Sequence, residues 1–529
     1  MEVFQRSLAG ADWAVIAGYA LVVIALGLWA GRRSASGTDF FLASRDSSWP
    51  VIGLSLLASN ISSSTLIGLA GAAYASGIAV YNYEWMATVI LVFFCIFFLP
   101  FILRAQVYTM PEFLERRFSR PVRAYFSALT IFLSVFVDKA ATLYGGALML
   151  SLIFPGVPLW QMIAALAALA GIYTIVGGLK AVLYTEVLQA VILLGAAVVL
   201  SVAAFDAAGG YTAVLAKVDP AKLSLIRPID DPAVPWLGLV TGVPILGFYF
   251  WCTNQFMVQR VLSARNIDHG RWGSLFAGLL KLPVLWLMVL PGTCAILLYP
   301  NLDRPDLVYP TLMFDLLPTG LLGLVIAGFL AAIMSATAST FNSAATLFTM
   351  DFARHWWPEM DGPALVRVGR LATLGFLAVA VMVAPQIERF GQVWDYIQGG
   401  LSYTAPPIVT VFLMGLFWPR ANARGAAFAI ASGLVLGVGL FIAINLTGTL
   451  KLHFLYVAPI LLAATALAMV VGTLTGPPPP AANTEGLLWN RAFFDAETAS
   501  LAGTPAWANY RILSALLLAG TAIIVWQFA

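Results

Sequence analysis

Apolar residues dominate the chain in long runs that short polar segments interrupt. A helix that crosses a membrane needs about 20 apolar residues, because each residue adds about 1.5 Å to its length. Runs such as 14–30 and 429–444 approach this length without a charged residue. Fourteen such segments can be delimited, near residues 13–31, 51–73, 85–104, 123–153, 159–176, 182–204, 236–259, 273–298, 311–349, 369–385, 393–418, 423–445, 453–473 and 508–527. We therefore predict an all-α polytopic membrane protein with about fourteen transmembrane helices.

The composition agrees with a protein whose surface faces lipid rather than water. Of the 529 residues, 61% are hydrophobic and 10% are charged, whereas a soluble protein carries about a quarter charged residues. The net charge of +3 is spread over short loops, so the sequence gives no sign of a nucleic-acid partner. The three cysteines lie in apolar runs without paired spacing and the three histidines are isolated, which argues against disulfides or a metal framework.

The distribution of positive charge predicts the orientation of the chain. Arg32 and Arg33 follow the first apolar run, whereas positive charge precedes the apolar part of a cleavable signal peptide. With the N-terminus outside, fourteen crossings place nineteen of the 28 Lys and Arg side chains inside and seven outside, with two within spans. We predict a multi-pass protein of the inner (plasma) membrane with both termini on the outer, periplasmic side. The Pro-rich stretch 474–507 is expected to be a cytoplasmic linker.

Six ionisable side chains fall within or near predicted spans, where a charge at mid-bilayer costs at least about 2.5 kcal/mol. They are Glu84, Asp138, Lys139, Glu186, Lys281 and Asp351. Structural ion pairing near helix ends explains Asp138, Glu186 and Asp351 as well as a functional role does. Glu84 and Lys281 are harder to explain structurally, because each lies in an aromatic or apolar run. Lys139 is interpreted as a structural partner of Asp138, or alternatively as a contact for an anionic solute.

Two predicted spans contain stretches that favour an interrupted helix. Residues 58–65 are mostly small or polar, and residues 241–244 and 247–251 combine glycine, proline and aromatic side chains. Breaks at corresponding places in two halves of a transporter mark its binding site, although small-residue helix packing explains either stretch alone. Residues 335–340 add a hydroxyl-rich helix face. Its oxygens suit a small cation, or they bond back to the helix carbonyls.

Several short motifs follow one another between about residues 40 and 430. They are ASNI at 58–61, GLAG at 68–71, YEW at 83–85, TMPEF at 109–113, GGL at 177–179, YTEVLQ at 184–189, WCTNQ at 251–255, VQRVLSA at 258–264, FNSAATLFTMD at 341–351, DYIQ at 395–398 and GLFWPR at 415–420. Together they resemble the sodium/solute symporter family, and in particular its sodium–sugar (glucose/galactose) cotransporter branch.

This resemblance implies a fold and a mechanism. The fold is LeuT-like, with two inverted five-helix repeats at 51–204 and 236–418 that work by alternating access. An extra helix at 13–31 precedes the repeats, and further helices within 423–527 follow them. The whole chain, 1–529, is then expected to form a single transmembrane transporter domain.

The resemblance also implies a central solute site. Its polar side chains fall on Asn60, Glu84, Lys281 and Gln398, which together offer the donors and acceptors that a neutral polyol needs. The remaining residues expected at the site are Tyr249 and Trp251 as apolar faces, Thr65 where the branch carries a longer hydrogen-bonding side chain, and Phe250 as the inner gate, where tyrosine is common.

A sodium site is the third implication of the resemblance. Its expected ligands are the carbonyl groups of Ala58, Ile61 and Ala332 and the hydroxyl group of Ser335. The family's second serine is Ala336 in this chain, so one hydroxyl ligand is missing. Nearby, Glu186 replaces the usual aspartate, and Ser339 lies one turn along the same helix as Ser335. We expect weaker or rearranged Na⁺ binding, for which the longer Glu186 side chain compensates.

Three classes of function remain open from the sequence. The first is a symporter that couples sodium entry to uptake of a neutral sugar or polyol, which motif order, topology and pocket chemistry favour. The second is a symporter of the same fold for a sugar acid or an amino acid, with protons as an alternative coupling ion because Glu186 offers a carboxylate. The third is a solute sensor or membrane-embedded enzyme. The sequence contains no output module or catalytic constellation, so we predict that the protein is not an enzyme. The sequence makes no prediction of the oligomeric state.

Overall fold

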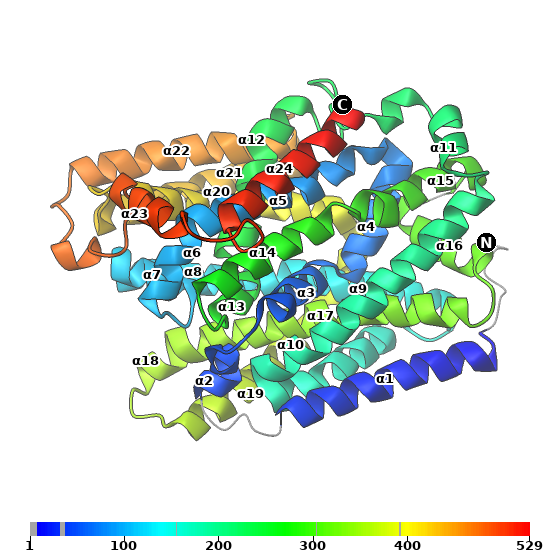
Figure 1. The fold of residues 1–529 in the computed structure, drawn as a ribbon, viewed down its shortest axis with the longest axis horizontal. Coiled ribbons are helices and arrows are strands. Elements are labelled where there is room, and N and C mark those ends of the chain that lie inside the picture. The colour runs from blue at the N-terminus through cyan, green and yellow to red at the C-terminus, as the bar shows by residue number, and fades with distance from the viewer. Residues whose placement is uncertain (1–7, 32–36, 155, 303, 391–392) are drawn as a thin grey trace.

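The computed structural model describes residues 8–31, 37–154, 156–302, 304–390 and 393–529, and every regular element within these ranges is a helix (Figure 1). Arg32 and Arg33, used in the orientation argument, lie outside the described residues. Eleven described helices are long and apolar enough to cross a membrane, or thirteen if each of two bent pairs forms one span. The shorter apolar helix Leu159–Ile172 brings this number to the predicted fourteen. The prediction of a multi-pass all-α protein is confirmed.

Most helices follow the predicted spans closely, but the span predicted at 311–349 begins too early, because residues 317–320 separate α16 from α17. Those of the first half are α1 (Gly10–Gly31), α2 (Gly37–Leu42), α3 (Trp49–Asn60), α4 (Ser63–Ser76), α5 (Asn82–Phe93), α6 (Leu99–Ala105), α7 (Met110–Arg117), α8 (Arg120–Phe132), α9 (Ala140–Ile153), α10 (Leu159–Ala207) and α11 (Tyr211–Lys217). Those of the second half are α12 (Trp236–Phe248), α13 (Gln255–Leu262), α14 (Ile267–Lys281), α15 (Leu290–Leu298), α16 (Val308–Leu316), α17 (Leu321–Leu347), α18 (Arg354–Trp356), α19 (Gly362–Val383), α20 (Val393–Phe417), α21 (Ala423–Phe441), α22 (Phe454–Leu474), α23 (Arg491–Leu501) and α24 (Tyr510–Gln527).

Short π-helical turns connect several of these helices into longer spans. They are η4 (Phe94–Phe98), η5 (Leu133–Lys139), η7 (Tyr249–Thr253), η8 (Leu285–Val289), η10 (Phe348–Ala353) and η12 (Ile442–Leu446). A π-turn adds one residue to a helical turn, so the side chains after it point in directions that a regular helix would not give them. Two of these turns, η5 and η7, border the candidate site described below.

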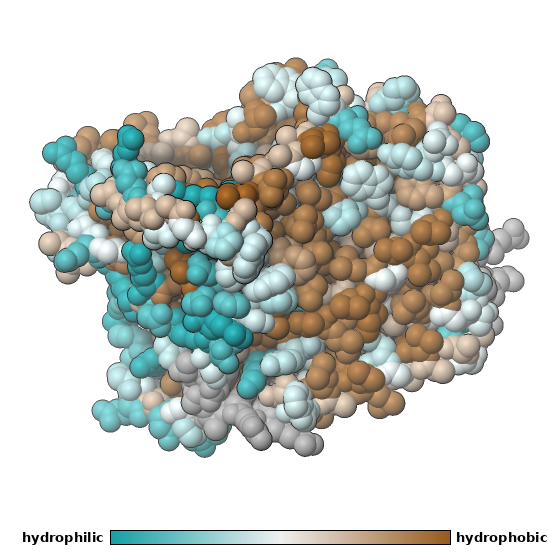
Figure 2. Space-filling model, viewed as in Figure 1, coloured by the Kyte–Doolittle hydropathy of each residue, from teal (hydrophilic) through white to brown (hydrophobic). Residues whose placement is uncertain are grey.

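The molecular surface carries the pattern expected of a protein surrounded by lipid. Hydrophobic side chains cover a broad band across the helices, and hydrophilic side chains gather at the end near α7, α13 and α23 (Figures 1 and 2). Large apolar side chains such as Leu21 on α1 and Val435 on α21 are exposed. Water would penalise such exposure, whereas a bilayer would not.

The first predicted break lies where the sequence places it. Helices α3 and α4 are two halves of one span, bent by 63°, and Ile61 and Ser62 between them have extended backbone. The Ser62 hydroxyl accepts a hydrogen bond from the Thr65 N–H, and the Ser62 N–H donates to the Thr65 hydroxyl, both at 3.3 Å. This reciprocal cap satisfies backbone groups that the break removes from the helix. The interruption predicted for residues 58–65 is confirmed.

The second break is displaced from its predicted position. Residues 241–248 remain helical within α12, and the chain leaves the helix only at Asn254, after the π-turn η7. Gly242 serves packing instead, because a Cβ atom there would lie 2.3 Å from the carbonyl oxygen of Leu455 on α22. The prediction of an interruption at 241–244 and 247–251 was therefore wrong, because these residues remain helical or π-helical. The small residues let α12 and α22 approach each other closely.

Helix α10 contains two of the predicted spans, 159–176 and 182–204. The two arms meet at a kink at Gly178, which has a positive φ of 58°. A Cβ atom at this position would lie 2.6 Å from the carbonyl oxygen of Phe40. Both the backbone conformation and the close approach of the α2 segment therefore require glycine.

The predicted linker 474–507 contains a docked helix, α23. Its Glu497 carboxylate accepts hydrogen bonds from Arg271 on α14, from the Tyr510 hydroxyl (2.6 Å) and from Arg511 (2.9 Å). Burial alone would raise the pKa of Glu497, but the Tyr510 hydrogen bond and the two guanidinium groups lower it below its ordinary value. These contacts, which we call the Glu497 latch, fix α23 against α14 and α24.

We predict that Glu497→Gln releases α23, because the neutral amide loses two charge-assisted hydrogen bonds. Limited proteolysis between residues 474 and 507 should become several times faster at neutral pH. In the unsubstituted protein the latch should hold at neutral pH and weaken only as the pH falls through the lowered pKa of Glu497, since a depressed carboxyl pKa stabilises the charged, folded form above it. Glu485→Gln, an exposed carboxylate in the same stretch, is the matched control. Equal cleavage rates in both variants would contradict the prediction.

Candidate functional site

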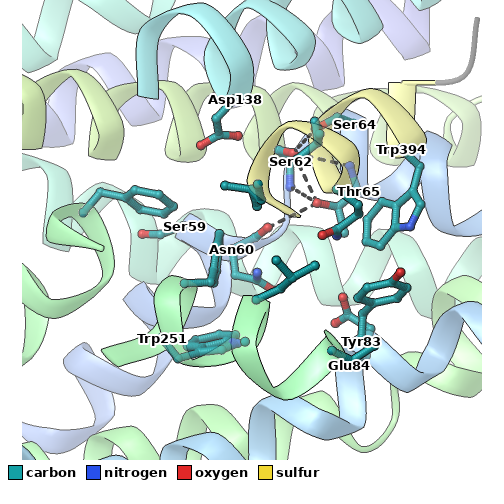
Figure 3. A pocket seen from close by; sticks show the side chains of 18 of the residues that line it. Ser59, Asn60, Ser62, Ser64, Thr65, Tyr83, Glu84, Asp138, Trp251 and Trp394 are labelled. Atoms are coloured by element: carbon teal, nitrogen blue, oxygen red, sulfur yellow. Dashed lines mark hydrogen bonds between the residues drawn. The ribbon is translucent and has the colours of Figure 1, made fainter. Parts of the chain in front are cut away.

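A polar cavity lies beside the break between α3 and α4, and its wall includes residues of α5, α12 and α20 (Figure 3). Its volume of about 90 Å³ leaves room for several water molecules. The polar side chains that line it are Ser59, Asn60, Ser62, Ser64, Thr65, Glu84, Asp138, Lys139 and Gln398. Aromatic side chains complete the wall, namely Tyr83, Phe250, Trp251, Phe256 and Trp394. Such a mixture of aromatic faces and a few convergent polar groups is typical of a small-molecule site.

The structure brings most of the predicted solute-binding residues together. The predicted residues that line the cavity are Asn60, Thr65, Glu84, Phe250, Trp251 and Gln398. Tyr249 is fully buried and is absent from the described lining. The π-turn η7 begins at Tyr249 and directs the next two side chains, Phe250 and Trp251, to the cavity instead. The structure therefore gives no support to the predicted role of Tyr249.

Lys281 organises the polar side of the cavity from behind its wall. It ends α14, where this helix and α15 are bent by 44°. Its ammonium group donates to Glu84 Oε2 at 2.5 Å and to Asn60 Oδ1, and lies 5.7 Å from the Trp251 ring centroid. The side chains of Lys281 and Glu84 are 1% and 5% exposed. Removing one member of such a buried pair costs about 3–5 kcal/mol, so the two charges require each other.

Three of these side chains come from three different elements and meet at the helix break. Asn60 ends α3, Glu84 lies in the first turn of α5 and Lys281 ends α14. Thr65 holds the unwound segment, because its hydroxyl donates to the Asn60 carbonyl at 3.2 Å in addition to its part in the cap. The Lys281 ammonium orients one oxygen of Glu84 and the Asn60 amide oxygen. The other carboxylate oxygen and the amide NH₂ have the chemistry to accept from and donate to a polyol.

Aromatic pairs border the cavity. Tyr83 and Trp394 meet edge to face with ring centroids 5.4 Å apart, and Trp394 packs against Gly68, where a Cβ atom would lie 3.0 Å from the ring. On the wall formed by η7, Phe250 contacts Trp251 and Phe256, each with centroids 5.4 Å apart. Phe250 therefore lies in the cavity wall, and its role as the inner gate stays a prediction. Trp394 was missed, although it directly precedes the motif at 395–398.

Three of the four predicted ion ligands meet between α3 and α17. The Ser335 hydroxyl donates to the Ala58 carbonyl at 2.8 Å and to the Ala332 carbonyl at 3.2 Å. Ile61 has extended backbone at the end of α3, so its carbonyl points out of the regular helix direction. Carbonyl and hydroxyl oxygens at an unwound helix suit Na⁺. The residues present therefore fit the ion, and Ala336, fully buried beside Ser335, adds no oxygen ligand.

Glu186 lies next to this candidate ion site in a network of its own. Its Oε1 atom accepts hydrogen bonds from Ser59 (2.9 Å), Ser339 (2.6 Å) and Arg260 (2.9 Å), and its Oε2 atom accepts from Ser55. The Ser339 hydroxyl also donates to the Ser335 carbonyl at 2.7 Å. Glu186 thus joins the ion site through Ser339, while the fully buried Arg260 neutralises its charge. The expected compensation for Ala336 by Glu186 remains a prediction.

The other ionisable residues of the spans are paired as the structural interpretation expects. Asp351 accepts from Arg123 at 2.6 Å, and Asp138 lies 3.1 Å from the ammonium group of Lys139. Arg260 directly follows the predicted span 236–259 and is one of the nineteen cations that the sequence places inside, but it is buried against Glu186. Its position within the motif at 258–264 is the signal that could have identified it.

The fold has known counterparts among solved structures. A structure described as the substrate-bound outward-open state of a Na⁺-coupled sialic acid symporter matches with a TM-score of 0.79 at 21% identity, over 89% of this chain and 99% of that one. A nucleobase-cation-symport-1 family transporter matches with a TM-score of 0.57 at 15% identity, over 86% of this chain and 98% of that one. At these identities the likeness concerns the fold alone.

Sequence comparison identifies nearer relatives. Sodium/glucose cotransporter 4 of Danio rerio is 36% identical over 91% of this chain and 81% of the relative. Sodium/glucose cotransporter 1 of Oryctolagus cuniculus is 35% identical over 93% and 82%. Sodium/myo-inositol cotransporter 2 of the same species is 35% identical over 92% and 80%. The family model described as "Sodium:solute symporter family" matches residues 40–437, and this chain therefore belongs to that family of transporters.

Proposed function

We propose that the protein is a secondary active symporter that couples sodium entry to the uptake of a neutral sugar or polyol. Family membership supports a sodium-coupled transporter, and the sodium/glucose and sodium/myo-inositol cotransporters among the relatives support a sugar or polyol as the solute. The cavity beside the broken span supports the same class, because it combines donors, acceptors and aromatic faces. We place the protein in the cell inner (plasma) membrane with both termini outside.

One observation carries this proposal: the buried contact of Lys281 with both Glu84 and Asn60 at the end of a broken helix. A purely structural ion pair would not need an amide at an unwound helix end, nor a cavity lined by Gln398 and Trp251. A neutral polyol can exchange hydrogen bonds with these groups without bringing a new charge into the membrane. The proposed solute contacts are Asn60, Thr65, Glu84, Trp251 and Gln398, with Lys281 as the positioning cation.

The proposed sodium site shares the broken helix with the solute site. Ala58 and Ile61 belong to the same segment as Asn60, while Ala332 and Ser335 belong to α17. An ion held between α3 and α17 would stabilise one arrangement of the two helices and pre-order Asn60. Solute and ion would then favour each other's binding by an equal free energy, as reciprocal coupling requires. The membrane potential adds about 2.3 kcal/mol per charge for every 100 mV.

We predict that Gln398→Ala raises the half-saturating concentration of solute at least about tenfold, because a buried hydrogen-bonding partner is lost. The measurement is uptake of a panel of hexoses and polyols into proteoliposomes under an imposed sodium or proton gradient. Thr404→Ala, which lies on α20 but outside the described cavity lining, is the matched control. Sodium-driven uptake of at least one neutral sugar or polyol by the unsubstituted protein is expected. Uptake driven only by protons, or only of carboxylates, would refute the proposed function.

We predict that Ala336→Ser lowers the sodium concentration that gives half-maximal uptake by about threefold to tenfold. The substitution restores a hydroxyl beside Ser335. If this oxygen contributes as much to the free energy of sodium binding as a typical hydrogen bond, the gain is about 1 kcal/mol. Ala344→Ser, an equally buried alanine two turns further along α17, controls for the added volume. An unchanged sodium dependence in Ala336→Ser would show that this position does not face the ion.

A further inference from the structure

The cavity wall carries a second carboxylate, Asp138, which pairs with Lys139 but remains more exposed than its partner. Four charged side chains lie in or directly behind the wall: Glu84, Asp138, Lys139 and Lys281. Three of them are almost completely covered, with side chains 5% (Glu84), 1% (Lys139) and 1% (Lys281) exposed. The Asp138 side chain is 26% exposed. Among these four charged side chains, that of Asp138 is therefore the most exposed, and it belongs to the cavity lining.

Local structure explains why aspartate and lysine at adjacent positions are exposed so differently. Both end the π-turn η5, which alters the direction of side chains relative to a regular helix. The Lys139 ammonium turns back to Asp138 Oδ2 at 3.1 Å and lies 5.6 Å from the Phe256 ring centroid. The Thr142 hydroxyl bonds to the Asp138 carbonyl at 2.9 Å and fixes this turn. The Asp138 carboxylate is thus held at the cavity by its neighbours.

The two carboxylates occupy different walls. In Figure 3, Asp138 lies on the side of Ser62 and Ser64, while Glu84 lies on the other side of the unwound segment, near Tyr83. The hydroxyl groups of Ser62 and Ser64 are 2.7 Å apart. A solute between the walls would therefore meet an acceptor carboxylate at each end. Of the cations that balance these carboxylates, Lys281 lies behind the wall, and Lys139 is in the lining but its side chain is only 1% exposed.

We propose that Asp138 is a specificity-determining residue of the solute site, which accepts a hydrogen bond from a hydroxyl or ammonium group and excludes carboxylates. This inference rests on the proposed function and narrows its solute class. A carboxylate accepts a stronger hydrogen bond from a donor group than a neutral acceptor does. In a site of low dielectric it also repels an anionic solute. The site therefore accepts neutral polyols and amino sugars and rejects sugar acids. Lys139, covered by Asp138 and Phe256, does not attract an anionic solute.

The test compares three competitors of the same ring shape against uptake of a labelled hexose in proteoliposomes. The competitors are the neutral hexose, its 2-amino-2-deoxy derivative and its uronic acid. The unsubstituted protein should be inhibited by the first two and at least tenfold more weakly by the uronic acid. In Asp138→Asn, inhibition by the amino sugar relative to the hexose should weaken about tenfold, and inhibition by the uronic acid should strengthen by a similar factor.

Two further variants keep the test decisive. Asp138→Asn combined with Lys139→Met removes both charges and should give the same change in selectivity, because the covered lysine is not the group that the solute meets. Asp315→Asn, an exposed carboxylate on α16, should leave all ratios unchanged. If a variant binds solute without transporting it, the three competitors are compared by how well each displaces bound labelled hexose from the purified protein. Loss of hexose binding in both Asp138 variants with an unchanged melting temperature would also support the assignment.

The outcomes separate this inference from the proposed function. If the unsubstituted protein takes up a hexose and Asp138→Asn keeps its selectivity among the three competitors, the role of Asp138 is refuted and the proposed function stands. If the unsubstituted protein prefers the uronic acid, the role of Asp138 is likewise refuted. If it takes up no sugar or polyol under a sodium gradient, the proposed function fails, and this inference fails with it.

Discussion

The need to neutralise charge inside the membrane governs how the centre of this protein is built. Lys281 and Glu84 are both covered, and neither could remain charged at this depth without the other. Their contact fixes the end of α14 against the start of α5. It also holds Asn60 at the point where α3 stops. One ion pair thereby joins three helices around a cavity. The polar groups of the cavity remain oriented because separating the buried pair has a high free-energy cost.

The break between α3 and α4 connects the two candidate sites. Backbone carbonyls released at this break face α17, where Ser335 meets Ala58, and the side chain of Asn60 from the same segment faces the solute cavity. In the proposed mechanism, ion binding on one side of the segment would reach the solute side through this one stretch of backbone. The Ser62–Thr65 cap keeps this irregular backbone satisfied, which is the condition for such a segment to exist at membrane depth.

Much of this arrangement follows from the sequence, and the remainder depends on tertiary packing. Glu84 and Lys281 were recognisable because charge within apolar runs is costly, and residues 58–65 because hydroxyl and amide groups are rare in mid-span. The break predicted within 241–251 was misplaced, since glycine permits close helix packing as readily as it permits unwinding. The direction of Asp138 depends on a π-turn that no periodicity reveals. Trp394 reaches the cavity only because Gly68 leaves space for its ring.

The Glu497 latch has a mechanical consequence for the transport cycle. Helix α14 carries Arg271, which contacts Glu497, on one stretch and Lys281 at its end, and ten residues of helix separate them by about 15 Å. As long as the Glu497 latch holds, a tilt of α14 that rearranges the ion pair at the cavity would also move α23. Helix α23 lies at the end of the molecule where hydrophilic side chains gather (Figures 1 and 2). The position of the polar stretch before the last helix would then change with the conformation of the cavity buried in the bilayer.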